Sequence, residues 1–81
     1  MLQVGQVVWA RAGRDKNRYF VVLDCDEPYA YIADGKRRRT EKPKKKKTIH
    51  LRPTLTIAPR ERIVTDREIR KILQPFQGEN V

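Results

Sequence analysis

Three short runs of residues that favour β-strands follow one another closely near the start of the chain, with no helix-length segment between them. The runs are residues 7–12, 19–23 and 29–33, and they are rich in Val, Tyr, Phe and Ala. Between the first two, residues 13–18 include Gly, Asp and Asn, which form tight turns readily. Short strands at this spacing predict an antiparallel sheet rather than an alternation of strands and helices.

Two further strands are expected after the third run. Asp34-Gly35 is the dipeptide best suited to a two-residue hairpin turn, so residues 36–39 are expected to run back beside the third strand. Residues 48–52 are expected to form a last short strand that ends at Pro53, because proline cannot donate a ladder hydrogen bond.

We therefore predict a single, mainly β domain in which residues 1–53 form a small antiparallel barrel of about five strands. Closure into a barrel removes exposed strand edges that would otherwise aggregate. At 81 residues, the chain is too short for two separate cores or for a large enzyme fold. In the first strand, the charge on Arg11 favours Val8, Ala10 and Ala12 as the inward-facing set.

The last third of the chain changes character. Residues 54–64 are expected to be a connector, and residues 65–74 a short C-terminal helix that ends before Pro75. The Thr65 hydroxyl is expected to accept the Glu68 amide, and the Glu68 side chain is expected to reach back, as in a capping box. A helix of about two to three turns is not stable alone, so it must dock on the barrel or on a partner. Its apolar face consists of Ile69, Ile72 and Leu73.

Positive charge is concentrated in a basic arm, residues 36–47. These twelve residues hold nine of the 19 Lys and Arg side chains and one acid, Glu41, so they carry +8 of the net charge of +9. Such an arm requires a polyanion, which RNA, DNA, an anionic membrane or an acidic protein can supply. A hairpin would fix the arginines, whereas the lysines after Pro43 are expected to be loose. The candidate phosphate-binding residues are Lys36, Arg37, Arg38, Arg39, Lys42, Lys44, Lys45, Lys46 and Lys47.

Nucleic-acid binding is the interpretation favoured by this pattern, because Arg forks onto phosphate oxygens and each engaged phosphate releases counterions. The alternatives are a solubilising loop and, for residues 43–47, a nuclear import signal. Trp9 and Tyr19 flank the polar turn and are the candidates for base stacking, the other aromatic residues being assigned to the core. A methyl-lysine cage built from the same rings is the alternative for these aromatic residues.

The inventory of catalytic residues is nearly empty. The chain has one cysteine, Cys25, and one histidine, His50. This count excludes zinc sites with three or four His and Cys ligands, and it also excludes redox motifs that need paired cysteines. We interpret these two residues as structural side chains. The alternative is that they meet in space and form a catalytic nucleophile pair. Asp24, Asp26 and Glu27 form either a magnesium site or a solvated acidic turn. We predict a binding protein with no enzymatic activity, no cofactor and no metal.

The expected compartment is the reducing cytoplasm. A single cysteine cannot form an intramolecular disulfide, and the N-terminus has no apolar run of signal-peptide length. No segment approaches the length of a membrane span, so no membrane insertion is expected. The free protein is expected to be monomeric.

A set of ordered segments resembles a known family. These segments are residues 5–8, 12–22, 33–36, 41–46, 50–51 and 65–73. The first two are similar to a KOW motif, and the whole set resembles the bacterial KOW-domain proteins related to the L-fourteen-e type of ribosomal protein. The resemblance implies an SH3-like barrel that binds RNA, typically ribosomal RNA, through the loop of residues 13–18.

Carried onto this chain, the resemblance assigns Gly13 as the motif glycine and Arg14, Lys16 and Arg18 as its basic positions. Asn17 departs from the family pattern, which often has glycine there, but asparagine tolerates a left-handed backbone. Residues 54–62 have no clear counterpart. The implied function is RNA binding in or near the large ribosomal subunit or its assembly, with ribosomal proteins as further partners. The alternatives are an SH3-like protein-interaction adaptor and polybasic attachment to a membrane.

Overall fold

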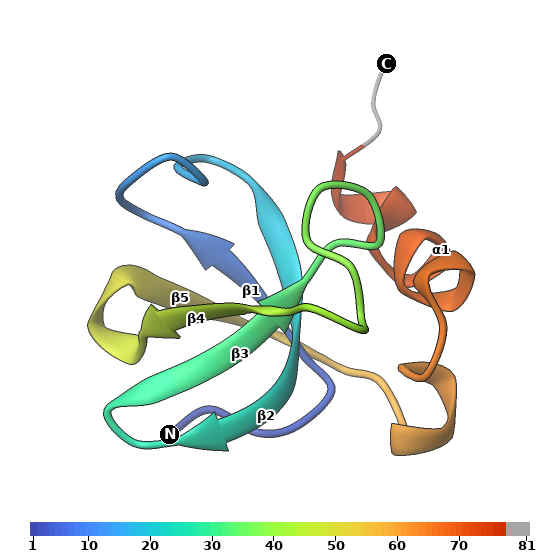
Figure 1. Cartoon of the computed structure of the whole chain (residues 1–81), viewed down its shortest axis with the longest axis horizontal. Helices are drawn as coiled ribbons and strands as arrows, with labels where there is room; N and C mark the ends of the chain where they lie inside the picture. The colour runs from blue at the N-terminus through green and yellow to red at the C-terminus, as the bar shows by residue number, and fades with distance from the viewer. Residues whose placement is uncertain (78–81) are drawn as a thin grey trace.

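The computed structural model describes residues 1–77, which form a curved five-stranded antiparallel sheet with a helix packed against it (Figure 1). The mainly β prediction, with a small barrel-like sheet and a C-terminal helix, is confirmed. Two short 3₁₀ turns, η1 (Thr48–His50) and η2 (Arg60–Arg62), follow the fourth and fifth strands. The strands are β1 (Gln6–Ala10), β2 (Tyr19–Asp26), β3 (Tyr29–Ala33), β4 (Lys44–Lys47) and β5 (Leu51–Ile57), and the helix is α1 (Asp66–Gln77).

The strand order is β4-β3-β2-β1-β5, so the first three strands form a central meander and the last two lie at its edges. The first three strands lie where the apolar runs predict them. In the β1–β2 pair Val7 lies opposite Val21, and in the β1–β5 pair Ala10 lies opposite Leu51. This arrangement brings the connection between β1 and β2 to the same end of the sheet as the long connection that follows β3 (Figure 1).

The predicted hairpin at Asp34-Gly35 is wrong. Residues 34–43 form a loop, and the strand that pairs with β3 is the lysine run of β4. The reason is that the Asp34 carboxylate accepts the backbone amides of Lys36 and Arg38, both at 2.9 Å. This side chain folds the chain into a compact turn instead of an extended return strand.

The prediction that the lysines after Pro43 are loose is also wrong. Residues 44–47 pair along the whole of β3, with Lys44 opposite Ile32 and Lys47 opposite Tyr29. Lysine is not a strong strand former, so the open backbone edge of β3 and the side-chain contacts of Lys46 described below decide the conformation. The lysines alternate between half-buried and exposed positions, as the two faces of a strand require.

The last strand also differs from its predicted bounds. Residues 48–50 form η1, and β5 begins at Leu51 and continues through Pro53 to Ile57. Proline is tolerated here because β5 lies at the edge of the sheet, and the pairing of β1 with β5 is irregular between Gln6 and Val8. Residues 54–57 of the predicted connector therefore belong to the sheet.

Buried side chains of the described residues form two clusters, one on each face of the central strands. Val8 and Ala10 point into the barrel together with Phe20 and Ile32, as predicted, and Ala12 is half-buried beyond the strand. Val7 lies on the opposite face of β1 and is also fully buried, because α1 covers it. A fully buried Val, Leu or Ile contributes about 1.5–3 kcal/mol. The second cluster consists of Val7, Val21, Ala58, Ile63, Ile69, Ile72 and Leu73.

The helix begins at the predicted cap, but the Glu68 side chain does not reach back to Thr65 as expected. The backbone amide of Glu68 donates to the Thr65 hydroxyl at 3.2 Å, while the Glu68 carboxylate binds Arg62 at 3.0 Å. The prediction that the helix ends before Pro75 is wrong, since α1 continues to Gln77. Proline this close to the end removes one hydrogen bond, and the ring of Phe76 packs on Tyr19 with centroids 5.2 Å apart. That contact holds the last turn against the sheet.

Candidate nucleic-acid interface

The connection between β1 and β2 is tied to the basic arm through Asp15. The Asp15 side chain is 2% exposed. Its Oδ1 accepts a hydrogen bond from Nε of Arg38, and its Oδ2 accepts one from Nη2, each at 3.2 Å. This bidentate geometry is the strongest form of an Arg–carboxylate pair. The contact fixes the loop of residues 13–18 beside the loop of residues 34–43.

Lys46 completes the same cluster from β4. Its Nζ atom donates to the carbonyl of Ala12 at 2.8 Å and lies 3.7 Å from Asp15. The Lys46 side chain is 9% exposed, so its charge faces the Asp15 carboxylate rather than solvent. Two of the candidate phosphate-binding residues, Arg38 and Lys46, are therefore engaged in holding the two loops together.

Helix α1 holds the loop of residues 34–43 from the other side. The backbone amide of Thr40 donates to Asp66 Oδ1 at 2.8 Å, and Arg70 Nη1 donates to the Gly35 carbonyl at 2.8 Å. Gly35 has a φ of 78°, and the backbone of Asp66 fills the space where a β-carbon would lie. The basic loop is thus fixed by Asp15 on one side and by α1 on the other.

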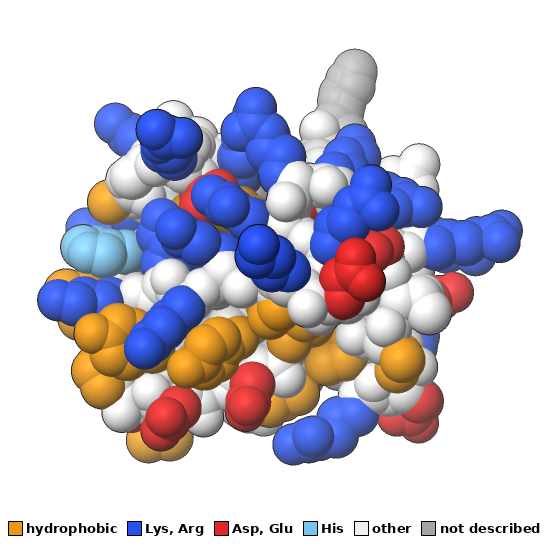
Figure 2. Space-filling view, viewed as in Figure 1, with side chains coloured by type: hydrophobic (Ala, Val, Ile, Leu, Met, Phe, Trp, Pro, Cys, Tyr) orange, Lys and Arg blue, Asp and Glu red, His pale blue; other side chains and the backbone are white. Residues whose placement is uncertain are grey.

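The other basic side chains of this region face outward from that frame. Lys44 is half-buried, and the remainder are exposed. Figure 2 shows Lys and Arg side chains spread over the upper half of one face of the molecule. The exposed candidates are Arg14, Lys16, Arg18, Lys36, Arg37, Arg39, Lys42, Lys45 and Lys47.

A groove of about 570 Å³, which we call the aromatic groove, lies between the two loops and the end of α1. Lys16, Arg18 and Arg37 line it, although they come from different segments of the chain. The half-buried rings of Tyr19 and Phe76 line it as well. The remaining lining residues are Asn17, Asp34, Lys36 and Gln77.

The turn that presents Lys16 and Arg18 adopts the predicted backbone. Asn17 has a φ of 67°, the left-handed conformation for which glycine is usual and which asparagine tolerates. The amide of Asn17 donates to the Ala10 carbonyl at 2.8 Å, and the amide of Ala10 donates to the Arg18 carbonyl at 2.9 Å. Two predicted basic positions of the loop are therefore presented on a closed hairpin.

The two predicted stacking residues lie in different places. Tyr19 lines the aromatic groove, whereas Trp9 lies half-buried on β1 opposite Arg52 of β5. Tyr29 and Tyr31, which were expected in the core, are half-buried on β3. Lys45 Nζ lies 4.3 Å from the centroid of the Tyr29 ring, a cation–π contact.

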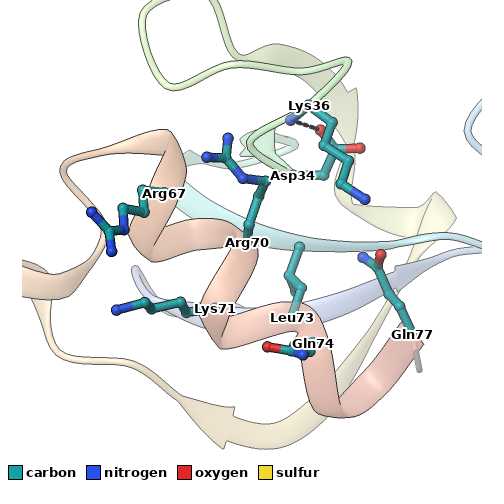
Figure 3. A pocket seen from close by; sticks show the side chains of 8 residues that line it. All are labelled: Asp34, Lys36, Arg67, Arg70, Lys71, Leu73, Gln74 and Gln77. Carbon is teal, nitrogen blue, oxygen red and sulfur yellow. Dashed lines mark hydrogen bonds between the residues drawn. The ribbon is translucent and has the colours of Figure 1, made fainter. Parts of the chain in front are cut away.

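Sequence reasoning missed a second groove, of about 550 Å³, beside α1. We call it the helix groove; it is lined by Lys36 of the loop and by Arg67, Arg70 and Lys71 of the helix (Figure 3). The i, i+3 and i+4 spacing of the three helix residues places them on one side of the helix, and that signal was present in the sequence. The sequence did not show which part of the chain this side would face.

The catalytic alternative receives no support from Cys25. Burial, the nearby Glu27 carboxylate and the charges of Asp24 and Asp26 all raise the pKa of the Cys25 thiol. A raised pKa keeps the thiol protonated, whereas a nucleophilic cysteine needs a lowered one. Within residues 1–77, no group of three or more His, Cys, Asp or Glu side chains is placed to hold a metal ion.

A scan against protein-family models finds no match, and a search of curated proteins finds none. Among residues 1–77, no helix has both the length and the apolar character needed to cross a membrane. The function is therefore inferred from the charge and geometry of this chain's own residues.

Proposed function

We propose that this chain is a non-enzymatic RNA-binding module. The observation that carries the proposal is the aromatic groove, around which Lys16, Arg18, Lys36 and Arg37 meet on two loops. A flexible basic tail attracts any polyanion, whereas cations on a fixed frame also recognise the spacing of phosphates along a backbone. The resemblance to KOW-domain proteins favours ribosomal RNA in the cytoplasm, in the large subunit or its assembly, as the ligand.

In this mechanism the Arg side chains form paired hydrogen bonds with phosphate oxygens, and the Lys side chains supply mobile positive charge. Contacts of this kind position the protein but read little sequence. Recognition would therefore depend on the shape of the RNA, with ribosomal proteins as neighbours of the bound module.

The test is a binding titration with RNA at several salt concentrations. If about six phosphates are engaged, the logarithm of the affinity falls with the logarithm of the salt concentration at a slope of about −4 to −5. A flat salt response contradicts the proposal. Sedimentation with ribosomes at two salt concentrations, followed by crosslink mapping of the bound RNA, tests the ribosomal assignment.

A protein-interaction adaptor is the second candidate, and the edge strand β5 favours it. Leu55 is 101% exposed and Ile57 is 45% exposed on this strand, so apolar side chains lie beside an edge of the sheet. The helix face that the sequence left open to a partner is instead buried against β1 and β2. Capture of a partner protein that survives nuclease treatment would favour the adaptor.

A further inference from the structure

The aromatic groove and the helix groove are continuous. Asp34, Lys36 and Gln77 line both of them. Lys36 is exposed and is the basic residue that the two grooves share. Basic side chains therefore follow one another from the loop of residues 13–18, past Lys36, to the exposed side of α1, with Asp34 as the acidic residue that lines both grooves.

Figure 3 shows how the basic side chains follow one another beside the helix. Arg70 lies between Lys36 on one side and Arg67 and Lys71 on the other. All three helix side chains are exposed, and Arg70 also donates to the Gly35 carbonyl. Lys71 approaches Glu68 at 4.0 Å with 54% of its side chain exposed, a weak surface pair that leaves its charge accessible.

The acidic side chains beside this path are engaged in contacts of their own. Asp34 is 7% exposed, and its carboxylate accepts two backbone amides of its own loop. Asp66 accepts the backbone amide of Thr40. Glu68 binds Arg62 and lies outside the residues that line the helix groove. The side chains that remain accessible along the described path are therefore dominated by Lys and Arg.

We infer that the two grooves form one binding path for an unpaired stretch of RNA, with α1 as one wall of the path. This inference rests on the proposed RNA-binding function and names its substrate class and an additional binding surface. The phosphates contact Lys16, Arg18, Lys36 and Arg37 in the aromatic groove, and Arg67 and Lys71 beside α1. Bases turn toward the rings of Tyr19 and Phe76.

The aromatic rings distinguish single strands from duplexes. Base faces are covered by stacking within a duplex, so rings at the side of a basic groove are reached by unpaired bases only. The path also bends from two loops onto the side of a helix, and a flexible single strand follows such a bend at little cost. A polyanion bound by charge alone would gain nothing from Tyr19 and Phe76.

The experiment measures fluorescence anisotropy of a labelled uridine oligonucleotide of about 12 nucleotides, and of an RNA duplex of equal length, at several salt concentrations. The test variant combines Arg67→Gln with Lys71→Gln, and the control combines Arg52→Gln with Arg60→Gln. All four side chains are exposed, and in the described chain neither control residue lines either groove. Arg70 is left intact because it holds the loop.

The test variant is expected to bind the uridine oligonucleotide about tenfold more weakly near physiological salt, with a slope reduced by about 1.4, as the loss of two phosphate contacts requires. The control variant should change affinity less than about threefold. Phe76→Leu should weaken oligonucleotide binding about fivefold or more through lost stacking, with little effect on the duplex. Circular dichroism would show that each variant remains folded.

The outcomes separate this inference from the proposed function. Equal losses in the test and control variants, with binding retained, would overturn the role of α1 and leave RNA binding intact. Tighter binding to the duplex than to the oligonucleotide would overturn the assignment to unpaired RNA. Failure of the unmodified chain to bind either RNA would overturn the proposed function and this inference with it.

Discussion

Both oxygens of the Asp15 carboxylate receive the guanidinium of Arg38, at 3.2 Å each, across 23 residues of sequence. One partner belongs to the β1–β2 loop and the other to the basic arm, so a single acid determines how two cationic segments lie beside each other. The negative charge of Asp15 also offsets the repulsion between Arg38 and Lys46. A chain with a net charge of +9 needs such compensation where its cations converge.

Asp15→Asn is expected to destabilise the fold by about 2 kcal/mol. Fully buried ion pairs cost about 3–5 kcal/mol when one partner is removed, and Arg38 retains 29% exposure, which lowers that cost. Urea denaturation of Asp15→Asn, Arg38→Gln and the double variant gives a double-mutant cycle. A coupling of about 1–2 kcal/mol is expected, and strictly additive effects would show that the pair does not stabilise the structure.

The adjacent arginines of the arm are expected to behave differently from one another. Arg37 and Arg39 are exposed, so replacing each with Gln should alter the free energy of unfolding by less than about 0.5 kcal/mol per substitution. The double variant should bind RNA more weakly and with a smaller salt slope. Arg38→Gln should instead lower the melting temperature, because it uncovers Asp15. Thermal melts and RNA titrations of the two variants provide the comparison. Identical effects on stability would contradict the view that Arg38 stabilises the fold whereas Arg37 and Arg39 serve binding.

Gly35→Ala is expected to separate the basic loop from α1. The new β-carbon would collide with the Asp66 backbone, and a φ of 78° is unfavourable for alanine by about 1–2 kcal/mol even without the collision. We expect a loss of about 2–3 kcal/mol in unfolding free energy, measured with urea, and weaker RNA binding. Gly13→Ala is the matched control, since it has a similar φ of 81° and its β-carbon would meet a side-chain atom, Lys46 Nζ at 3.1 Å, instead of the backbone of α1. A loss no greater at Gly35 than at Gly13 would show that the contact with α1 is unimportant.

The sequence was sufficient for the strands that are rich in apolar residues. The runs around Val8, Phe20 and Ile32 were placed correctly, because their side chains are driven into a core whatever surrounds them. The N-terminus of α1 was also correct, since the cap at Thr65 is a local interaction. Local signals therefore predicted most of the sheet and the start of the helix.

The errors occurred where a contact distant in sequence decides the structure. The strand formed by residues 44–47 depends on the edge of β3 and on the Lys46 contacts with Asp15 and Ala12, none of which is visible in a run of lysines. The candidate site was predicted only in part, because contacts distant in sequence also arrange its residues. Its basic residues could be named from charge, but the meeting of Lys36 with α1 depends on how the helix docks.

Cys25 is expected to react slowly with alkylating reagents, although its half-buried side chain is partly accessible to them. Burial and the Glu27 carboxylate raise the pKa of its thiol, so at a given pH a smaller fraction is the reactive thiolate. The rate of iodoacetamide reaction should therefore rise at a higher pH than it does for a free cysteine. Glu27→Gln removes the nearby charge, whose oxygen lies 3.9 Å from the sulfur, and should shift the rate profile to lower pH. A rate that rises at a lower pH than for free cysteine would show that the pKa of the Cys25 thiol is lowered instead of raised. That result would favour the alternative in which Cys25 and His50 form a nucleophile pair.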